Sequence, residues 1–404
     1  MKPAVVDAYL RTRGLRRGLK GLGRRLLRRK RTVHFYYCVT DPYSHLMVQA
    51  LRATEWGNTE LEICVVPEPS ADTNPAPALQ ARWAREDARR LARHFDLSLP
   101  EADGLVSDER VRRANAVLLK SREALEQLEA LERVGRALHA GDPHGLSAAV
   151  ERYGVVKGHT VRPTLEQNYE TLRKRGHYQS GVCHYEGEWY VGLDRFDYLL
   201  ERLKGEGVDV HSPSYRVAET ATPSADELFF SFRSPYSYLA LERTRTWSRV
   251  PKLRPVLPMV ARGLEVPKTK IRYLLWDAKR EAERLGIELG KVADPVGEGV
   301  ERAMAVFFAA QKHQRGAEFA RAAMRASWAE GRDLARDDVL FALAAEVGFG
   351  RDETMAALKD TSWKAIAEEN RKALVDAGLW GVPTFVRGGE ALWGQDRIPW
   401  LADD

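Results

Sequence analysis

Cysteine is scarce in this sequence, and the second half of the chain has none. The three cysteines among the 404 residues are Cys38, Cys64 and Cys183. Because their number is odd and their spacing is wide, we expect free thiols in a reducing compartment, the cytoplasm, and no disulfide framework. Cys38 and Cys183 are expected to be buried as small apolar side chains, on strands that could bring them near each other.

Two other absences narrow the class of protein. The sequence has no run of about 18 or more apolar residues, so we expect no membrane-spanning helix. Its ten histidines are scattered along the chain. His177 and His184 lie near Cys183, but they do not form the compact ligand set that a metal site needs, and we predict no metal.

The most informative segment is 228–239, in which an apolar strand runs directly into Ser234, Pro235 and Tyr236. Serine followed by proline is typical of a helix start, where the serine caps the first turn. The unpaired N–H groups and the positive dipole end of such a helix favour a thiolate beside it. Without a Cys-x-x-Cys the segment cannot cycle its own disulfide, but the Ser234 hydroxyl could hydrogen-bond the sulfur of a bound thiol. The alternative is that Ser234 only caps the helix.

The end of the chain carries a second set of motifs. Residues 381–385 read Gly-Val-Pro-Thr-Phe, and 393–397 read Trp-Gly-Gln-Asp-Arg after a short hairpin. An X-Pro peptide is usually trans, so the proline alone proves little. With the serine motif, however, residues 226–404 resemble the DsbA-like thioredoxin-fold branch that contains 2-hydroxychromene-2-carboxylate isomerase and kappa-class glutathione transferases. Residues 270–277, Lys-Ile-Arg-Tyr ahead of an aspartate on an amphipathic helix, also stand where that family has them.

The resemblance implies a glutathione-dependent isomerase or transferase, with glutathione as the cofactor. Glutathione would pair its backbone with Val382, immediately before Pro383, in the manner of a strand. The Asp396 carboxylate, with Gln395 beside it, would hold the γ-glutamyl ammonium. Lys270 would meet a carboxylate of the tripeptide.

Ser234 is the expected catalytic residue in this scheme. Its hydroxyl would donate a hydrogen bond to the glutathione sulfur, and the thiolate would add to an unsaturated or aromatic acid. Isomerisation and conjugation use the same activated thiolate, so the sequence leaves both open. Arg233 departs from the family pattern, and we expect it to add positive charge near the thiolate or to recruit an acidic substrate.

The N-terminal half repeats the C-terminal half in four blocks that keep the same order. Self-similarity of this length predicts two domains and not a solenoid. The expected fold class is therefore α/β, with two tandem thioredoxin-like domains of the DsbA type. Each carries a long helical insertion, at roughly 76–175 and 268–378. One pair represents each block: Pro42 and Pro235, Asp87 and Asp277, Arg113 and Arg302, Asp194 and Asp396.

The two repeats differ where chemistry is expected. Asp41 stands in place of Ser234, and an aspartate beside a thiol would raise the thiol pKa and leave less nucleophile. We therefore predict that the N-terminal repeat is degenerate for thiol binding and is a structural or regulatory partner. The alternative gives it a different ligand, with Asp41 as a general base. The other replacements are Gly181 for Pro383 and Gln80 for Lys270.

The length suits two domains of roughly 180 to 190 residues, each with its own core. We place a basic arm at 1–31, the degenerate domain at 32–208, a linker at 209–225 and the domain with the expected active site at 226–404. Related enzymes usually pair two identical subunits. The repeat could thus form an internal pseudo-dimer, so that the protein is a monomer.

Residues 1–31 carry an unusual excess of positive charge. They contain twelve Lys or Arg against one acid, Asp7, which gives +11 in a chain whose net charge is +6. Leu15, Leu19, Leu22 and Leu26 recur at helical spacing, so we expect a basic amphipathic helix, although nearby glycines weaken it. It would suit a membrane surface, an acidic partner or a mitochondrial presequence; the alternative is a disordered tail that docks on acidic surface. Nucleic-acid binding would be non-specific and salt-dependent.

Two other function classes compete with the glutathione-dependent enzyme. A disulfide oxidoreductase is disfavoured by the missing Cys-x-x-Cys, and reversible oxidation of Cys38 would revive it. A non-catalytic thioredoxin-fold binding or scaffold protein would use the basic arm as its working part. Glutathione binding separates the enzyme from the scaffold.

Overall fold

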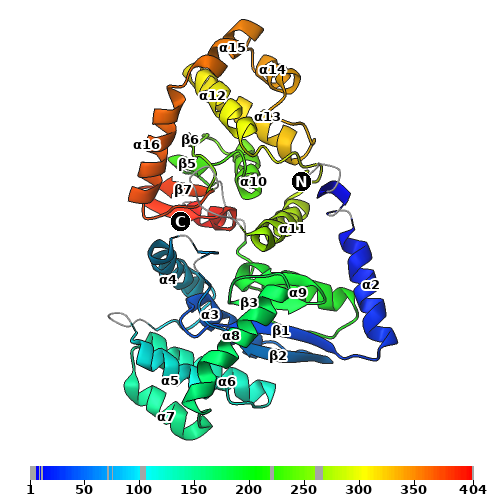
Figure 1. Cartoon of the computed structure of the whole chain (residues 1–404), viewed down its shortest axis with the longest axis vertical. Helices are drawn as coiled ribbons and strands as arrows, with labels where there is room; N and C mark the ends of the chain where they lie inside the picture. Colours follow the sequence, from blue (N-terminus) through cyan, green and yellow to red (C-terminus); the bar gives the residue numbers. More distant parts are fainter. Residues whose placement is uncertain are drawn as a thin grey trace. The chain divides into compact units, whose positions relative to one another are not determined.

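The computed structural model describes residues 6–8, 10, 12–70, 72–74, 76–100, 106–218, 223–259 and 267–402. The chain forms two compact units (Figure 1). The N-terminal unit is Leu15–Arg216, and the C-terminal unit is Val217–Asp404 together with Met1–Gly14. The division lies inside the predicted linker, of which residues 219–222 lie outside the described residues. So do parts of the predicted arm.

The N-terminal unit is built on a four-stranded sheet of order β2-β1-β3-β4. Strand β1 (Arg31–Tyr37) is parallel to β2 (Thr59–Val65) and antiparallel to β3 (Val182–Tyr185), which forms a hairpin with β4 (Glu188–Val191). The helices are α3 (Pro42–Arg52), α4 (Pro77–His94), α5 (Asp108–Leu118), α6 (Ala124–His139), α7 (Pro143–Tyr153), α8 (Gly158–Lys174) and α9 (Gly192–Gly205).

The C-terminal unit has a sheet of order β6-β5-β7-β8. Strand β5 (Glu227–Phe230) is parallel to β6 (Lys252–Pro255) and antiparallel to β7 (Thr384–Arg387), which forms a hairpin with β8 (Glu390–Trp393). The helices are α10 (Pro235–Arg243), η1 (Thr244–Thr246), α11 (Lys268–Leu285), α12 (Glu298–Lys312), α13 (Gly316–Trp328), α14 (Asp337–Glu346), α15 (Arg351–Lys359), α16 (Trp363–Asp376) and η3 (Gln395–Leu401).

Both helical insertions occupy the places that the sequence predicts. They separate the second strand from the third, as α4 to α8 in one unit and α11 to α16 in the other. The C-terminal unit ends in a 3-10 helix, η3, and not in an α-helix. Pro399 lies inside it, and proline lacks the N–H that an α-helix would use there.

The two sheets share strand order and strand directions, and two hydrogen bonds recur. The Asn168 side chain donates to the Val65 carbonyl (2.8 Å), and Asn370 donates to that of Pro255 (3.0 Å). In each unit a glycine N–H also donates across the start of the terminal hairpin, Gly192 to Gly181 (2.8 Å) and Gly394 to Pro383 (2.9 Å). These contacts follow the register of the sequence repeat. Tandem duplication remains a prediction.

Aromatic side chains close the core beside the strand that leads to Ser234. Phe230 and Phe232 lie edge-on to one another, with ring centroids 5.3 Å apart. Phe307 of α12 packs against Phe230 at 5.7 Å, in the geometry that aromatic pairs favour. All three rings are fully buried. The insertion thus anchors the end of β5 and fixes where the following helix begins.

The amphipathic helix predicted in the basic arm is present as α2 (Arg13–Leu26). The Arg17 guanidinium makes two 2.6 Å hydrogen bonds to the Glu188 carboxylate on β4. Arg24 donates to Glu186, in the turn between β3 and β4, at 2.6 Å. Acidic residues of the chain itself therefore hold part of the arm's positive charge.

Candidate active site of the C-terminal unit

Ser234 caps the N-terminus of α10, with Pro235 in the first helical position. The backbone N–H of Ser237 donates to Ser234 Oγ at 3.1 Å, and Ser237 Oγ accepts from the N–H of Ser231 at 3.3 Å. The turn between β5 and α10 is therefore fixed by its own serines. A hydroxyl that accepts as a cap keeps its proton for donation, so capping and thiol binding are compatible uses of the half-buried Ser234.

The Val382–Pro383 peptide is cis. Thr384, the next residue, begins β7 and pairs with Phe229 of β5. Ser234 follows the end of β5 by four residues, so the cap and the proline turn lie at the same edge of the sheet. Among the residues that the structure describes, none hydrogen-bonds the Val382 backbone. Its N–H and C=O are therefore available to a strand-like ligand.

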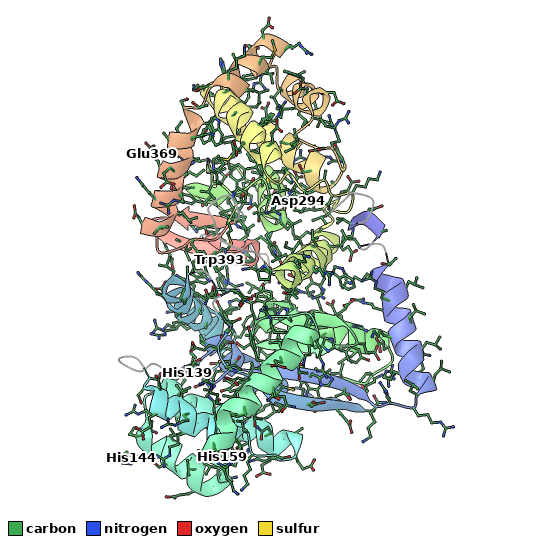
Figure 2. All side chains as sticks on the ribbon, viewed as in Figure 1. His139, His144, His159, Asp294, Glu369 and Trp393 are labelled. Carbon is green, nitrogen blue, oxygen red and sulfur yellow. The ribbon has the colours of Figure 1, made fainter. Side chains whose placement is uncertain are left out.

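The glycine before this turn is required by packing. A Cβ on Gly381 would lie 2.4 Å from the indole ring of Trp393, which is closer than any real contact. Trp380 packs on the same indole, with centroids 4.7 Å apart. The backbone at 381–383 therefore lies directly against the β8 side of the hairpin (Trp393 is labelled in Figure 2).

Gln395 is held by hydrogen bonds to three neighbouring side chains. Its side chain is buried, and its Nε2 donates to Glu281 (2.8 Å) and to Asp396 (2.6 Å). Its Oε1 accepts from Arg243 at 2.7 Å. The amide therefore has protein partners on both sides, and a role of Gln395 in cofactor binding remains a prediction. Asp396 is half-buried and is oriented by this amide.

Helix α11 connects the two motif-bearing ends of the domain. Asp277 is buried and accepts from the Tyr236 hydroxyl at 2.6 Å, next to Ser234. Glu281, one turn later and also buried, accepts from Gln395. Because residues four apart share a helix face, the same face of α11 holds both motifs.

Lys270 lies seven residues before Asp277, which places it on that face, two turns towards the helix start. Its side chain is half-buried, and burial lowers the pKa of its ammonium because the charge is partly removed from water. Such a group gains most from an anionic ligand. The position and chemistry suit a carboxylate.

Arg233 is already neutralised. Its guanidinium pairs with both oxygens of Asp294, at 2.8 and 2.9 Å, and Asp294 lies in the loop before α12 (Figure 2). This two-point pairing uses the Nε and Nη2 donors that a substrate carboxylate would need for the same geometry. The expectation that Arg233 supplies free positive charge to a thiolate or an acidic substrate is therefore wrong.

The matching place in the N-terminal unit is occupied by its own side chains. Asp41 caps α3 and accepts hydrogen bonds from Tyr43 and Ser44 as well as from the Ser180 hydroxyl (2.9 Å). A Cβ on Gly181 would lie 3.0 Å from Asp41 Oδ2. Burial raises the pKa of Asp41 above its ordinary value. Because the Asp41 carboxylate already accepts four hydrogen bonds, it has little capacity left to bind a thiol or to act as a general base.

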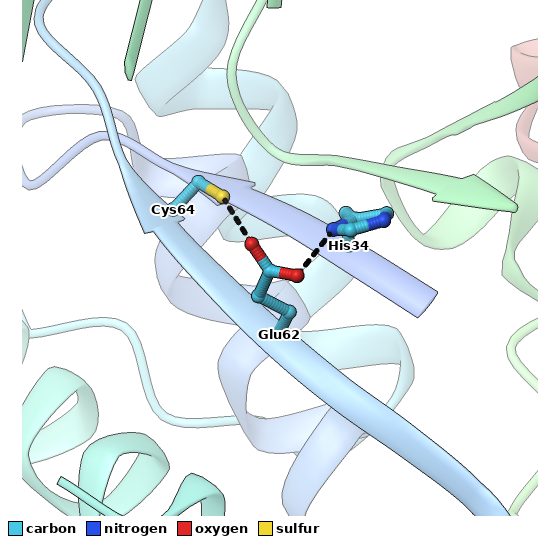
Figure 3. A group of neighbouring side chains, drawn as sticks. All are labelled: His34, Glu62 and Cys64. Carbon is cyan, nitrogen blue, oxygen red and sulfur yellow. Dashed lines mark hydrogen bonds and ion pairs between the residues drawn. The ribbon is translucent and has the colours of Figure 1, made fainter. Parts of the chain in front are cut away.

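One group of potential metal ligands was missed by sequence reasoning (Figure 3). Glu62 lies opposite His34 on the paired strands β1 and β2, with 3.0 Å between Nδ1 and Oε2, and Cys64 Sγ lies 3.9 Å from Oε1. The signal was the strand register, which spacing along the chain does not reveal. Burial, and after it the nearby Arg175 cation, lowers the pKa of His34. Arg175 also donates to Tyr36 at 2.6 Å, and its positive charge opposes a metal ion there. We assign no metal to this group.

All three cysteines are free thiols. Cys38 and Cys183 are fully buried, as expected. Burial is the main cause that raises the pKa of Cys38 and of Cys64 to about 12, because the thiolate loses its hydration. Thiols of this kind hold almost no thiolate at neutral pH. Such thiols are poorly suited to be the nucleophile of a disulfide oxidoreductase.

Comparison with known proteins supports the reading of the second half. Residues 227–404 match the model of the DSBA-like thioredoxin domain. The C-terminal half is a DsbA-like thioredoxin domain. The chain is 26% identical over 186 residues to 2-hydroxychromene-2-carboxylate isomerase of Pseudomonas putida, across 43% of this chain and 89% of that protein.

Solved structures resemble the chain over the same share of its length. A selenomethionine structure of 2-hydroxychromene-2-carboxylate isomerase is 25% identical and covers 43% of this chain and 91% of its own, with a TM-score of 0.39. The cytosolic disulfide reductase DsbM of Pseudomonas aeruginosa, solved with GSH, is 21% identical over 41% of this chain and 87% of its own, with a TM-score of 0.30.

Among the described residues, none of the helices is long and apolar enough to span a membrane.

Proposed function

We propose that the DsbA-like domain binds glutathione and uses its thiolate to isomerise an unsaturated or aromatic acid. One observation carries the proposal: the N-terminus of α10, capped by Ser234, lies at the same sheet edge as the unpaired Val382 backbone. The domain has no cysteine, so the thiol comes from a ligand. Similarity to an isomerase over 89% of that enzyme's length favours isomerisation over conjugation.

Each site residue has one part in glutathione binding. The Val382 backbone beside Pro383 pairs with the peptide backbone of glutathione. Asp396, held by Gln395, accepts from the γ-glutamyl ammonium, and Lys270 binds a carboxylate. Buried charged partners of this kind give both affinity and orientation.

Ser234 and the start of α10 activate the sulfur. The hydroxyl donates to the thiolate, and the positive end of the helix dipole favours the anion over the thiol. The thiolate then adds to the double bond of the acid, which turns that bond into a rotatable single bond. After rotation the electron pair returns, the carbon–sulfur bond breaks and glutathione leaves unchanged. Conjugation would stop after the addition and a proton transfer.

The N-terminal unit is proposed as a duplicated thioredoxin-like domain that does not bind glutathione. The saturated hydrogen bonding of Asp41 and the glycine at 181 support this role. It would be the structural or regulatory partner of the active domain, in place of a second subunit. Free, buried thiols agree with a protein of the cytoplasm.

Calorimetric titration with glutathione tests the proposal. The natural protein should bind, and Asp396→Ala should bind at least about tenfold more weakly, because a charged partner is lost. Asp194→Ala, the matching change in the N-terminal unit, is the control and should bind normally. Ser234→Ala should bind but lose the ultraviolet absorbance of the bound thiolate. Absence of binding, or equal loss in the two aspartate variants, would contradict the proposal and favour the scaffold function.

A further inference from the structure

Helix α2 exposes a stripe of leucines. Leu15, Leu19, Leu22 and Leu26 have exposed fractions of 64%, 59%, 50% and 73%, and Leu27 follows with 63%. Their spacing of four, three and four residues places the first four on one face. Leu125 is the only other strongly exposed leucine in the described part of the chain. Single exposed leucines are ordinary, but a contiguous apolar stripe marks a surface that binds something.

The opposite face of α2 is fixed to the N-terminal unit. Arg17 pairs in bidentate fashion with Glu188, whose side chain is only 2% exposed, and Arg24 pairs with Glu186. Gly21, between these arginines on the same face, is buried. The ion pairs therefore set the rotation of the helix. Its leucines point away from the unit that holds it.

Positive charge borders the stripe on both sides. Arg16 and Lys20 lie along one border and Arg25 along the other, and all three are exposed. Residues 28–30, two arginines and a lysine, continue the exposed basic surface. No acidic residue occurs between Asp7 and Asp41. The surface of α2 therefore combines an apolar centre with a rim of positively charged side chains.

We propose that α2 is an interfacial helix that binds an anionic lipid surface. The leucines would enter the boundary between headgroups and acyl chains, and the basic rim would lie against lipid phosphates. Charge decides against a second copy of this chain as the occupant. Stripe-to-stripe pairing would bring two basic rims together, whereas an anionic bilayer complements both the apolar and the charged parts. The Arg17 and Arg24 pairs present the stripe without unfolding of the N-terminal unit.

Vesicle sedimentation with the full chain tests this assignment. The protein should bind vesicles of phosphatidylcholine with phosphatidylglycerol, and at least about tenfold more weakly to phosphatidylcholine alone or in high salt. Leu19→Gln with Leu22→Gln should reduce binding to the mixed vesicles at least about tenfold. Leu125→Gln, on α6, is the matched control and should bind as the natural protein does. Lys20→Gln with Arg25→Gln should weaken binding and flatten its salt dependence.

Three results would overturn the proposal. These are no binding to anionic vesicles, equal binding by the Leu19/Leu22 variant, and a self-association in sedimentation velocity that the leucine changes abolish. The last result would assign the stripe to a second copy. Because the changed side chains are exposed, we expect each variant to unfold at the same urea concentration as the natural protein. This measurement confirms that each variant is folded. Glutathione titration is independent of these outcomes, so the two proposals fail separately.

Discussion

The hydroxyl of Tyr236 donates a 2.6 Å hydrogen bond to the buried carboxylate of Asp277. This bond ties the first turn of α10, which Ser234 caps, to α11, the helix that also carries Lys270. The N-terminal unit contains the same pair, Tyr43 and Asp87, at 2.7 Å. The repeated bond provides a matched pair of variants that separate a structural role from a role at the active site.

Tyr236→Phe should lower the free energy of unfolding by about 1–3 kcal/mol, because the Asp277 carboxylate loses a donor while it stays buried. It should also weaken glutathione binding, since Ser234 is then held less firmly. Tyr43→Phe should have a similar cost in stability and no effect on glutathione. Urea unfolding and calorimetry measure the two effects. Equal affinity of the two variants for glutathione would show that the Tyr236 bond has no part in the site.

Gln395→Ala should weaken glutathione binding. The change removes one hydrogen bond from Glu281 and one from Arg243, at a cost of roughly 2–3 kcal/mol in stability, and it frees Asp396 to rotate. Because the effect on binding passes through Asp396, it should vanish in an Asp396→Ala background. A double-mutant cycle measures this coupling. Additive losses would show that Gln395 contacts glutathione directly.

Arg233→Gln should change glutathione affinity and the pKa of the bound thiol by little, because Asp294 already neutralises the guanidinium. Stability should fall by about 1 kcal/mol, since the pair is partly exposed and screened. Thiolate absorbance against pH is the measurement. A clear rise in the thiol pKa would restore the direct electrostatic role. Asp294→Asn is the companion variant, and it should lower the thiol pKa by unmasking the arginine.

Acid should open the N-terminal unit first. Burial lowers the pKa of His45 to about 3, of His139 to about 4, and of His177 and His184 to about 3. The unfolded chain takes up these protons below pH 6.5, whereas the folded unit does not. The stability that they contribute is therefore complete above about pH 6.5 and is lost as the pH falls towards about 4.

Within that window, each of these imidazoles lowers the free energy of unfolding by up to about 1 kcal/mol for each unit by which the pH falls. The C-terminal unit contains only one histidine, His313, so it lacks this source of acid sensitivity. Limited proteolysis near pH 7 and near pH 5, with the cuts located by mass spectrometry, identifies the unit that opens. His139→Gln should reduce the change in urea midpoint between the two pH values. Preferential cutting of the C-terminal unit at low pH would contradict the prediction.

Much of the architecture was readable from local pattern. The predicted insertions at 76–175 and 268–378 differ from the observed helical spans by two residues or fewer at each end. Capping and periodicity act over a few residues, so the sequence shows them directly. The start of α10 at Pro235, after the cap of Ser234, is decided in the same local way.

The partners of the charged side chains were decided only in three dimensions. Arg233 finds Asp294 61 residues away, Gln395 finds Glu281 114 residues away, and Arg17 finds Glu188 171 residues away. These distant contacts pair the Arg233 guanidinium with a carboxylate and give the Gln395 amide a buried partner, and spacing along the chain reveals neither.

The basic arm shows the same division between sequence and structure. Leucine spacing predicted an amphipathic helix within residues 1–31 with leucines on one side, and the structure has it at Arg13–Leu26. It did not determine which face turns outward. That depended on the Glu186 and Glu188 carboxylates, which the β3–β4 hairpin brings to the helix. The ion-paired face of α2 lies against the hairpin and the leucines are exposed, although leucine side chains are usually buried. The partners that decide this orientation are distant in sequence, so only the tertiary structure reveals it.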